Sequence, residues 1–178
     1  MKIFTIQDIT LDTSKVQYAQ NRCNYKEAKS AYHKLYKEYR LRYECNYKSF
    51  FWGFSKIIPK RNSCEYYPDI LKRLTKISFG VLNKDIKKNQ VLILEVPDEY
   101  CIATDFYAFN DVILNKSHNN LNAWNRIYTL GGVTQVIYPF ISPDMIICNF
   151  NPSELNDKLN WSDKFEDQIG ENLSSFFY

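Results

Sequence analysis

The sequence predicts one α+β domain. The chain has 178 residues, a length that suits one domain and leaves little room for a second. Hydrophobic residues make up 45% of the chain, which is enough for a packed core and excludes wholesale disorder. Strand patterns and helix patterns both recur along the chain, and together they indicate the α+β class.

The first third of the chain predicts a strand, a helix and a second strand. Residues 3–7 alternate and predict a short strand. Residues 12–14 are loop or N-cap residues, and a helix is expected to begin nearby. Residues 25–43 place tyrosine, alanine and leucine at helical spacing and predict a helix. Residues 47–58 are dense in aromatic side chains and predict a buried strand, in which Gly53 marks a bulge or a close backbone approach.

The remaining elements follow from apolar runs and helix caps. Residues 91–96, VLILEV, are almost wholly apolar and predict a central strand that Pro97 and Asp98 end. Further strands are expected at 100–104, 134–138 and 145–150, helices at 68–77, 105–114, 123–130 and 162–176, and loops at 59–66, 84–90 and 116–122. We expect residues 1–150 to form the domain and residues 151–178 to form an acidic, helical extension packed on it.

Several classes of site are missing from the sequence. The five cysteines are odd in number and widely spaced, so they form neither a disulfide framework nor a CxxC zinc site. No P-loop or GxGxxG motif occurs, and the two histidines lack partners at metal-ligand spacing. The carboxylate pairs Asp98/Glu99 and Asp105/Asp111 are more typical of turns and caps than of a glycosidase. The sequence therefore predicts no metal site, no membrane contact and a cytoplasmic location.

The charges are unevenly distributed along the chain. Residues 1–90 contain 19 lysine and arginine residues against 8 aspartate and glutamate residues, a net charge of +11. Residues 91–150 and residues 151–178 each carry −4, so the whole chain carries only +3. A basic half beside an acidic half indicates either contact with a nucleic acid at one surface or a fold whose halves attract each other.

The predicted helix at 25–43 contains the candidate basic surface. Lys34, Lys37, Arg40 and Arg42 alternate with aromatic rings, a pattern typical of proteins that bind nucleic acids. The same pattern describes an ordinary amphipathic helix, with its tyrosines in the core and its cations in solvent. The second interpretation is favoured because it needs no ligand.

The order of several short motifs resembles an uncharacterised bacterial domain family. The motifs are IFTIQ (3–7), EAKSAYHKLYKEY (27–39), FFWGF (50–54), LILEVPDEYCIATDF (92–106), LNAWNRIYTL (121–130) and TQVIYPF (134–140). They cover about residues 1–150. This resemblance implies a class of domain and no mechanism.

The same order is similar, more distantly, to the DNA-targeting ADP-ribosyltransferases of toxin–antitoxin systems. That resemblance implies a split mixed or antiparallel sheet flanked by helices, with NAD in a cleft between two half-sheets. In those enzymes a first strand carries a histidine that meets NAD, and a late strand carries the catalytic glutamate. Thr5 stands where the histidine would lie, and Gln135 stands where the glutamate would lie. Gln135 cannot ionise, so the residues argue against ordinary transferase activity.

This resemblance also implies a set of ligand-binding candidates. Trp52 would stack on a base or on nicotinamide, while Thr5 and Gln135 would supply hydrogen bonds. The full set is Thr5, Gln7, Trp52, Asp105, Trp124 and Gln135.

Two functions are expected as alternatives. The first is a nucleotide-binding (NAD-like) or nucleic-acid-binding domain, a degenerate or atypical transferase in the conflict between phage and bacterium. The second is a non-catalytic inhibitor of host defence, such as a phage anti-CRISPR protein, whose partner is a host nucleic-acid-binding protein. Size and composition alone suggest this second function, and the sequence leaves the oligomeric state open.

Overall fold

The structure, a computed structural model, describes residues 1–20, 28–57 and 88–150. The elements in chain order are β1 (Lys2–Asp8), β2 (Gln17–Tyr18), α1 (Lys29–Arg42), β3 (Phe51–Ile57), β4 (Asn89–Glu95), the 3-10 turn η2 (Asp98–Tyr100), β5 (Ile102–Asp105), α3 (Phe106–Leu114), α4 (Leu121–Arg126), β6 (Val133–Tyr138), β7 (Phe140–Ile141), the 3-10 turn η3 (Pro143–Met145) and β8 (Ile146–Phe150). The described part is an α+β domain, as predicted.

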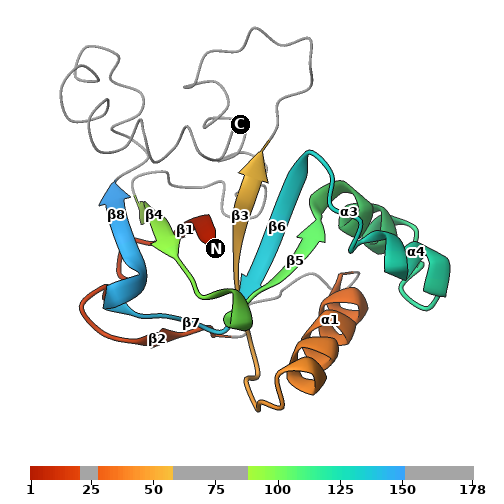
Figure 1. Ribbon diagram of the computed structural model, residues 1–178, viewed down its shortest axis with the longest axis horizontal. Helices are drawn as coiled ribbons and strands as arrows, with labels where there is room; N and C mark the ends of the chain where they lie inside the picture. Colours follow the sequence, from red (N-terminus) through yellow and green to blue (C-terminus); the bar gives the residue numbers. More distant parts are fainter. Residues whose placement is uncertain (21–27, 58–87, 151–178) are drawn as a thin grey trace, which may run out of the picture.

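A six-stranded antiparallel sheet forms the centre of the domain, in the order β5-β6-β3-β1-β4-β8 (Figure 1). β1 and β4 pair along their whole length, whereas β1 and β3 are in register at only one position, Phe4 opposite Phe54. The pairing between β1 and β3 is therefore the shortest in this sheet. We call the junction between β1 and β3 the seam.

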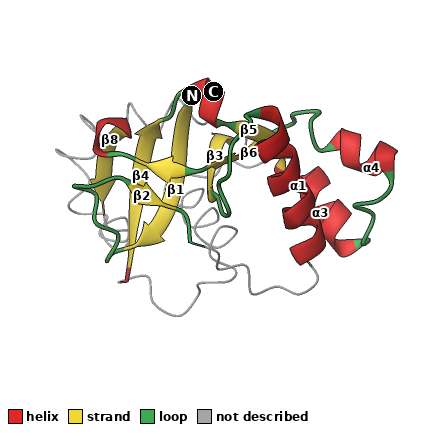
Figure 2. Cartoon of the chain, turned by 90° about the horizontal axis from the view of Figure 1, so that it is seen from below, coloured by secondary structure: helices red, strands yellow, loops and turns green. Residues whose placement is uncertain are grey.

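The two faces of the sheet pack into different hydrophobic clusters. Helices α1, α3 and α4 gather on one side of the domain (Figure 2), where they pack on Trp52, Ile102 and Ile137. The opposite face carries Ile3 and Val136 in a second cluster. Successive residues of a strand point to opposite faces, so these clusters show which face each strand residue belongs to.

The starts of α3 and α4 follow from their capping residues. Asp105 Oδ1 accepts a hydrogen bond from the backbone N–H of Ala108 at 2.8 Å, and Asn120 Oδ1 accepts one from Ala123 at 3.1 Å. Each bond satisfies a backbone donor that the first turn of a helix leaves free. The prediction that Asp105 is a cap is confirmed.

The prediction that a helix begins near residues 12–14, after β1, is wrong. Residues 9–20 contain no helix, because the Asp12 carboxylate accepts hydrogen bonds from the Ser14 backbone N–H at 3.0 Å and from the Ser14 hydroxyl at 2.6 Å, which holds a turn. Strand β2 follows and pairs with β7 in a small ribbon that the sequence did not predict.

The predicted elements at 59–66, 68–77 and 162–176, and the extension at 151–178, lie outside the described residues. In the described ranges, no helix has both the length and the apolar content that a membrane span requires.

Candidate nucleic-acid interface

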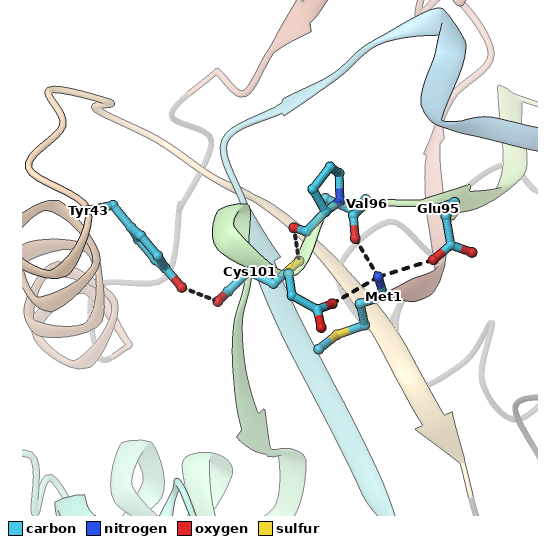
Figure 3. A network of polar contacts seen from close by, with 7 residues as sticks. Met1, Tyr43, Glu95, Val96 and Cys101 are labelled. Carbon is cyan, nitrogen blue, oxygen red and sulfur yellow. Dashed lines mark hydrogen bonds and ion pairs between the residues drawn. The ribbon is translucent and has the colours of Figure 1, made fainter.

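Helix α1 turns its tyrosines toward the protein interior. Tyr36 and Tyr39 are buried in the cluster that joins α1 to the sheet. The Tyr39 hydroxyl donates to the backbone carbonyl of Tyr100 at 2.7 Å. The Tyr43 hydroxyl donates to the backbone carbonyl of Cys101 at 2.6 Å, as Figure 3 shows. Burial raises the pKa of the Tyr39 phenol, which therefore stays a hydrogen-bond donor. The interpretation of these tyrosines as a buried face is confirmed.

The outer side of α1 is basic. Lys29, Lys37 and Arg42 are exposed, and Arg40 is half-buried beside them. We call these four residues the basic face; Lys29, Lys37 and Arg40 lie on one flank of the helix, and Arg42 lies on the other flank, near Tyr128. Within residues 1–20, 28–57 and 88–150, none of the four forms an ion pair with a carboxylate. No carboxylate of these ranges neutralises them, which makes them candidates for contact with an anionic partner.

Lys34, although predicted as part of this surface, is used inside the fold. Its ammonium donates to the His118 carbonyl at 2.7 Å and lies 4.3 Å from the centre of the Trp124 ring. The Trp124 indole N–H donates to Glu38 Oε1 at 2.7 Å, and the Tyr128 hydroxyl donates to Glu38 Oε2. This network fastens α1 to α4 and to the loop before it. Lys34 and Trp124 therefore stabilise the packing of α1 against α4. Trp124 is buried, so its ring is not accessible to a ligand.

Three of the ligand-binding candidates meet at the seam. The Thr5 hydroxyl donates to the Trp52 carbonyl at 2.5 Å, and Gln7 Nε2 donates to the Thr5 hydroxyl at 2.9 Å. The Trp52 indole N–H donates to the Tyr36 hydroxyl at 3.1 Å, and the ring packs edge-on against Tyr32 at 5.0 Å. These contacts therefore link β1 to β3 and β3 to α1.

Replacing Thr5 with valine is expected to lower the free energy of unfolding by about 1–3 kcal/mol, because the Trp52 carbonyl and the Gln7 amide would each be left without a partner. Thr5→Ser keeps the hydroxyl and is the matched control. Denaturant titration of the two variants and the natural protein measures the difference. A Thr5→Val protein as stable as the natural one would contradict a structural role for this hydroxyl.

Gln135 and Thr5 lie on opposite faces of the sheet. Gln135 shares its face with Ile137, which packs against the helices, whereas Thr5 shares the face of Ile3. Gln135 is paired across strands with Thr104, and in the described part of the chain its Nε2 and the Thr104 hydroxyl have no hydrogen-bond partner. The two candidates from the transferase resemblance are thus not brought into one pocket.

Asp105 uses both of its carboxylate oxygens within the fold. Oδ1 caps α3, and Oδ2 accepts from the backbone N–H of Gly131 at 3.0 Å. A Cβ at Gly131 would lie 2.6 Å from that oxygen, so the contact requires glycine. Neither oxygen is left to bind a ligand in the way the sequence suggested.

A cavity of about 370 Å³ lies where β1 begins and β3 ends. It is lined by Met1, Lys2, Ser55, Ala103, Leu130, Gly131 and Thr134, and none of the six predicted ligand-binding residues is among them. Beside it the ammonium of Met1 contacts the Val96 carbonyl at 2.5 Å and the carboxylates of Glu95 at 3.2 Å and Asp98 at 2.9 Å (Figure 3). Burial alone would lower the pKa of this ammonium, but the bonds to both carboxylates outweigh it and raise the pKa. The volume is at the small end for a ligand pocket.

A group of aromatic rings lies beside the C-terminal end of α1. We call Tyr18, Tyr47, Tyr100 and Phe140 the aromatic cluster. The rings of Tyr18 and Tyr47 are stacked at 6.2 Å with an angle of 24° between them, and Phe140 contacts Tyr18, Tyr47 and Tyr100 at 6.0, 6.3 and 5.1 Å. Arg40 Nη1 donates to the Tyr47 carbonyl at 3.2 Å, so the cluster adjoins the basic face.

Sequence reasoning missed this cluster because its members come from four separate elements. Tyr18 lies in the two-residue strand β2, and only the pairing of β2 with β7 sets it opposite Phe140. Tyr47 lies in the loop after α1, and Tyr100 closes η2. Burial, and then the proximity of Tyr18, raises the pKa of the Tyr47 phenol, which therefore stays neutral.

No protein-family model matches the chain, and no curated protein or solved structure is significantly similar to it. The resemblance to ADP-ribosyltransferases therefore stays a prediction. The assignment of a function rests on the surface of the chain itself.

Proposed function

We propose that the chain is a nucleic-acid-binding domain that contacts phosphates through the basic face of α1. The observation that carries the proposal is the set of cations on α1 without carboxylate partners among the described residues. Cations that are not neutralised within the protein can displace the counterions of a nucleic-acid backbone, and this release drives binding. The net charge of +11 over residues 1–90 supports the same conclusion.

The buried side of α1 supports the proposal as well. Tyr39 and Tyr43 fasten the helix to the backbone of Tyr100 and Cys101, and the Glu38–Trp124 bond fastens it to α4. A helix held at several points presents its cations in a fixed arrangement, so little order has to be gained on binding.

For the fold, we propose that the sheet is divided in the manner of an ADP-ribosyltransferase. The single registered pair between β1 and β3 supports this division. Fold likeness implies no activity, which depends on the site. The separation of Thr5 and Gln135 gives NAD binding no support, and NAD as a cofactor stays a prediction.

The second candidate function is binding to a protein, as expected for an inhibitor of host defence. The observation that favours it is Leu41, which is 70% exposed on the outer side of α1 among the cations. An apolar side chain within a charged surface is useful at a protein interface and adds nothing to phosphate binding.

Changing Lys29, Lys37 and Arg42 together to glutamine is expected to weaken nucleic-acid binding at about 50 mM salt by roughly tenfold or more. Arg40 is left unchanged because its bond to the Tyr47 carbonyl is part of the fold. The matched control changes Lys15, Lys116 and Arg126, which are exposed outside α1, to glutamine. Fluorescence anisotropy with a labelled oligonucleotide measures both variants. Equal weakening by the two triple variants would assign the effect to net charge and contradict a role for α1.

A further inference from the structure

We infer that the aromatic cluster stacks an unpaired base, so that the nucleic acid bound by this protein is single-stranded. The inference rests on the proposed binding of phosphates by the basic face. The aromatic cluster provides a second contact at the end of the basic face, in which the flat surface of a base stacks on an aromatic ring.

Tyr18 is the ring that a base can reach. It is 61% exposed, while Tyr47 and Phe140 pack against it at 6.2 and 6.0 Å. The backbone under it is held by the pairing of β2 with β7, in which Tyr18 lies opposite Phe140. An exposed aromatic ring braced by other rings is a platform for stacking, and it loses little freedom when a base covers it.

The charges around the cluster suit a phosphate backbone on one side. Arg40 is bonded to the Tyr47 carbonyl, and Lys48, the next residue along the chain, is exposed. Carboxylates lie next to Tyr100: Glu99 is exposed, and Asp98 is paired with the Met1 ammonium at 2.9 Å. A strand that runs from α1 past Arg40 and Lys48 keeps its phosphates beside cations while a base rests on Tyr18.

The aromatic cluster distinguishes a single strand from a duplex. In a duplex each base is already stacked between its neighbours and cannot lie on a protein ring, whereas an unpaired base can. The tyrosines within α1 are turned inward and offer no alternative platform. The basic face alone would bind both forms, and the aromatic cluster would add a preference for single strands.

The test compares Tyr18→Ala with Tyr18→Phe in the full chain, using an oligothymidylate of about 12 nucleotides and a duplex of about 12 base pairs at about 50 mM salt. Tyr18→Ala is expected to weaken binding of the single strand by roughly tenfold and to change duplex binding by less than about twofold. Tyr18→Phe keeps the ring and is expected to bind like the natural protein. A thermal melt of each variant establishes that the fold is kept.

An abasic oligomer of the same length supplies the charge without the bases. The natural protein is expected to bind it about as weakly as Tyr18→Ala binds oligothymidylate. Tyr18→Ala binding the single strand as tightly as the natural protein, or losing equal affinity for both nucleic acids, would overturn the inference and favour a protein partner for the aromatic cluster. If the natural protein binds no oligonucleotide at all, the proposed function itself fails.

Discussion

Replacement of Gly53 by alanine is expected to lower the free energy of unfolding by about 3 kcal/mol or more, through overpacking at the seam. A Cβ at this position would lie 2.3 Å from Ile3 Cγ2 and 2.8 Å from the backbone oxygen of Phe4. A side chain can turn away from such a contact, but a backbone oxygen cannot. β1 and β3 would have to separate, and they share only the pair of Phe4 with Phe54.

Denaturant titration of Gly53→Ala measures this effect, and a second variant separates its two causes. Adding Ile3→Ala removes the contact with Cγ2 and leaves the contact with the Phe4 oxygen. The double variant is therefore not expected to regain the stability of Ile3→Ala alone. If Gly53→Ala unfolds at the same denaturant concentration as the natural protein, that result would contradict the close contact between β1 and β3 at Gly53.

Replacement of Trp124 by alanine is expected to lower the free energy of unfolding by about 3–5 kcal/mol. The ring is buried between α1, α3 and α4, and its removal leaves a cavity in the cluster that holds the helices on the sheet. The change also removes the donor to Glu38 and the ring beneath the Lys34 ammonium. The Glu38 carboxylate then keeps only its bond from the Tyr128 hydroxyl, and the Lys34 ammonium keeps only its bond to the His118 carbonyl. The loss of one partner from each group adds to the cost of the cavity.

The control for this change is Trp124→Phe, which keeps an aromatic ring and removes the indole N–H. Its expected stability lies between those of the natural protein and Trp124→Ala. Because Trp124 is buried, the folded Trp124→Phe protein is expected to bind nucleic acid as the natural protein does. Calorimetric melting and anisotropy measure the two properties. A folded variant with weakened binding would place Trp124 in the interface and contradict its structural role.

Patterns that depend on neighbours in the sequence predicted much of the fold. The apolar run at 91–96 predicted the buried strand β4, and helical spacing predicted α1 with its tyrosines inside. Gly53 was predicted to mark a bulge or a close backbone approach, and the short distances from its position to Ile3 and Phe4 confirm the close approach. Each of these follows from residue type and spacing alone.

The candidate site could not be predicted in the same way, because it depends on which strands pair. Nothing in the spacing of Thr5 and Gln135 shows that they lie on opposite faces, since that follows from the register of the whole sheet. Lys34 resembles the other cations of its helix in sequence, and only the fold places His118 and Trp124 beside it. Tyr18 and Tyr47 could not be recognised from hydrophobic periodicity, because a two-residue strand and a loop are too short or too irregular to show one.

The salt dependence of nucleic-acid binding tests the central proposal most directly. When a lysine or arginine that neutralises a phosphate is replaced by glutamine, the slope of log affinity against log salt concentration becomes shallower by about one. The natural protein is expected to bind much more weakly as salt rises. The variant with Lys29, Lys37 and Arg42 changed to glutamine is expected to show a slope about three units shallower, and the control at Lys15, Lys116 and Arg126 an unchanged one. Equal slopes for the natural protein and the α1 variant would contradict binding of a nucleic acid by the basic face.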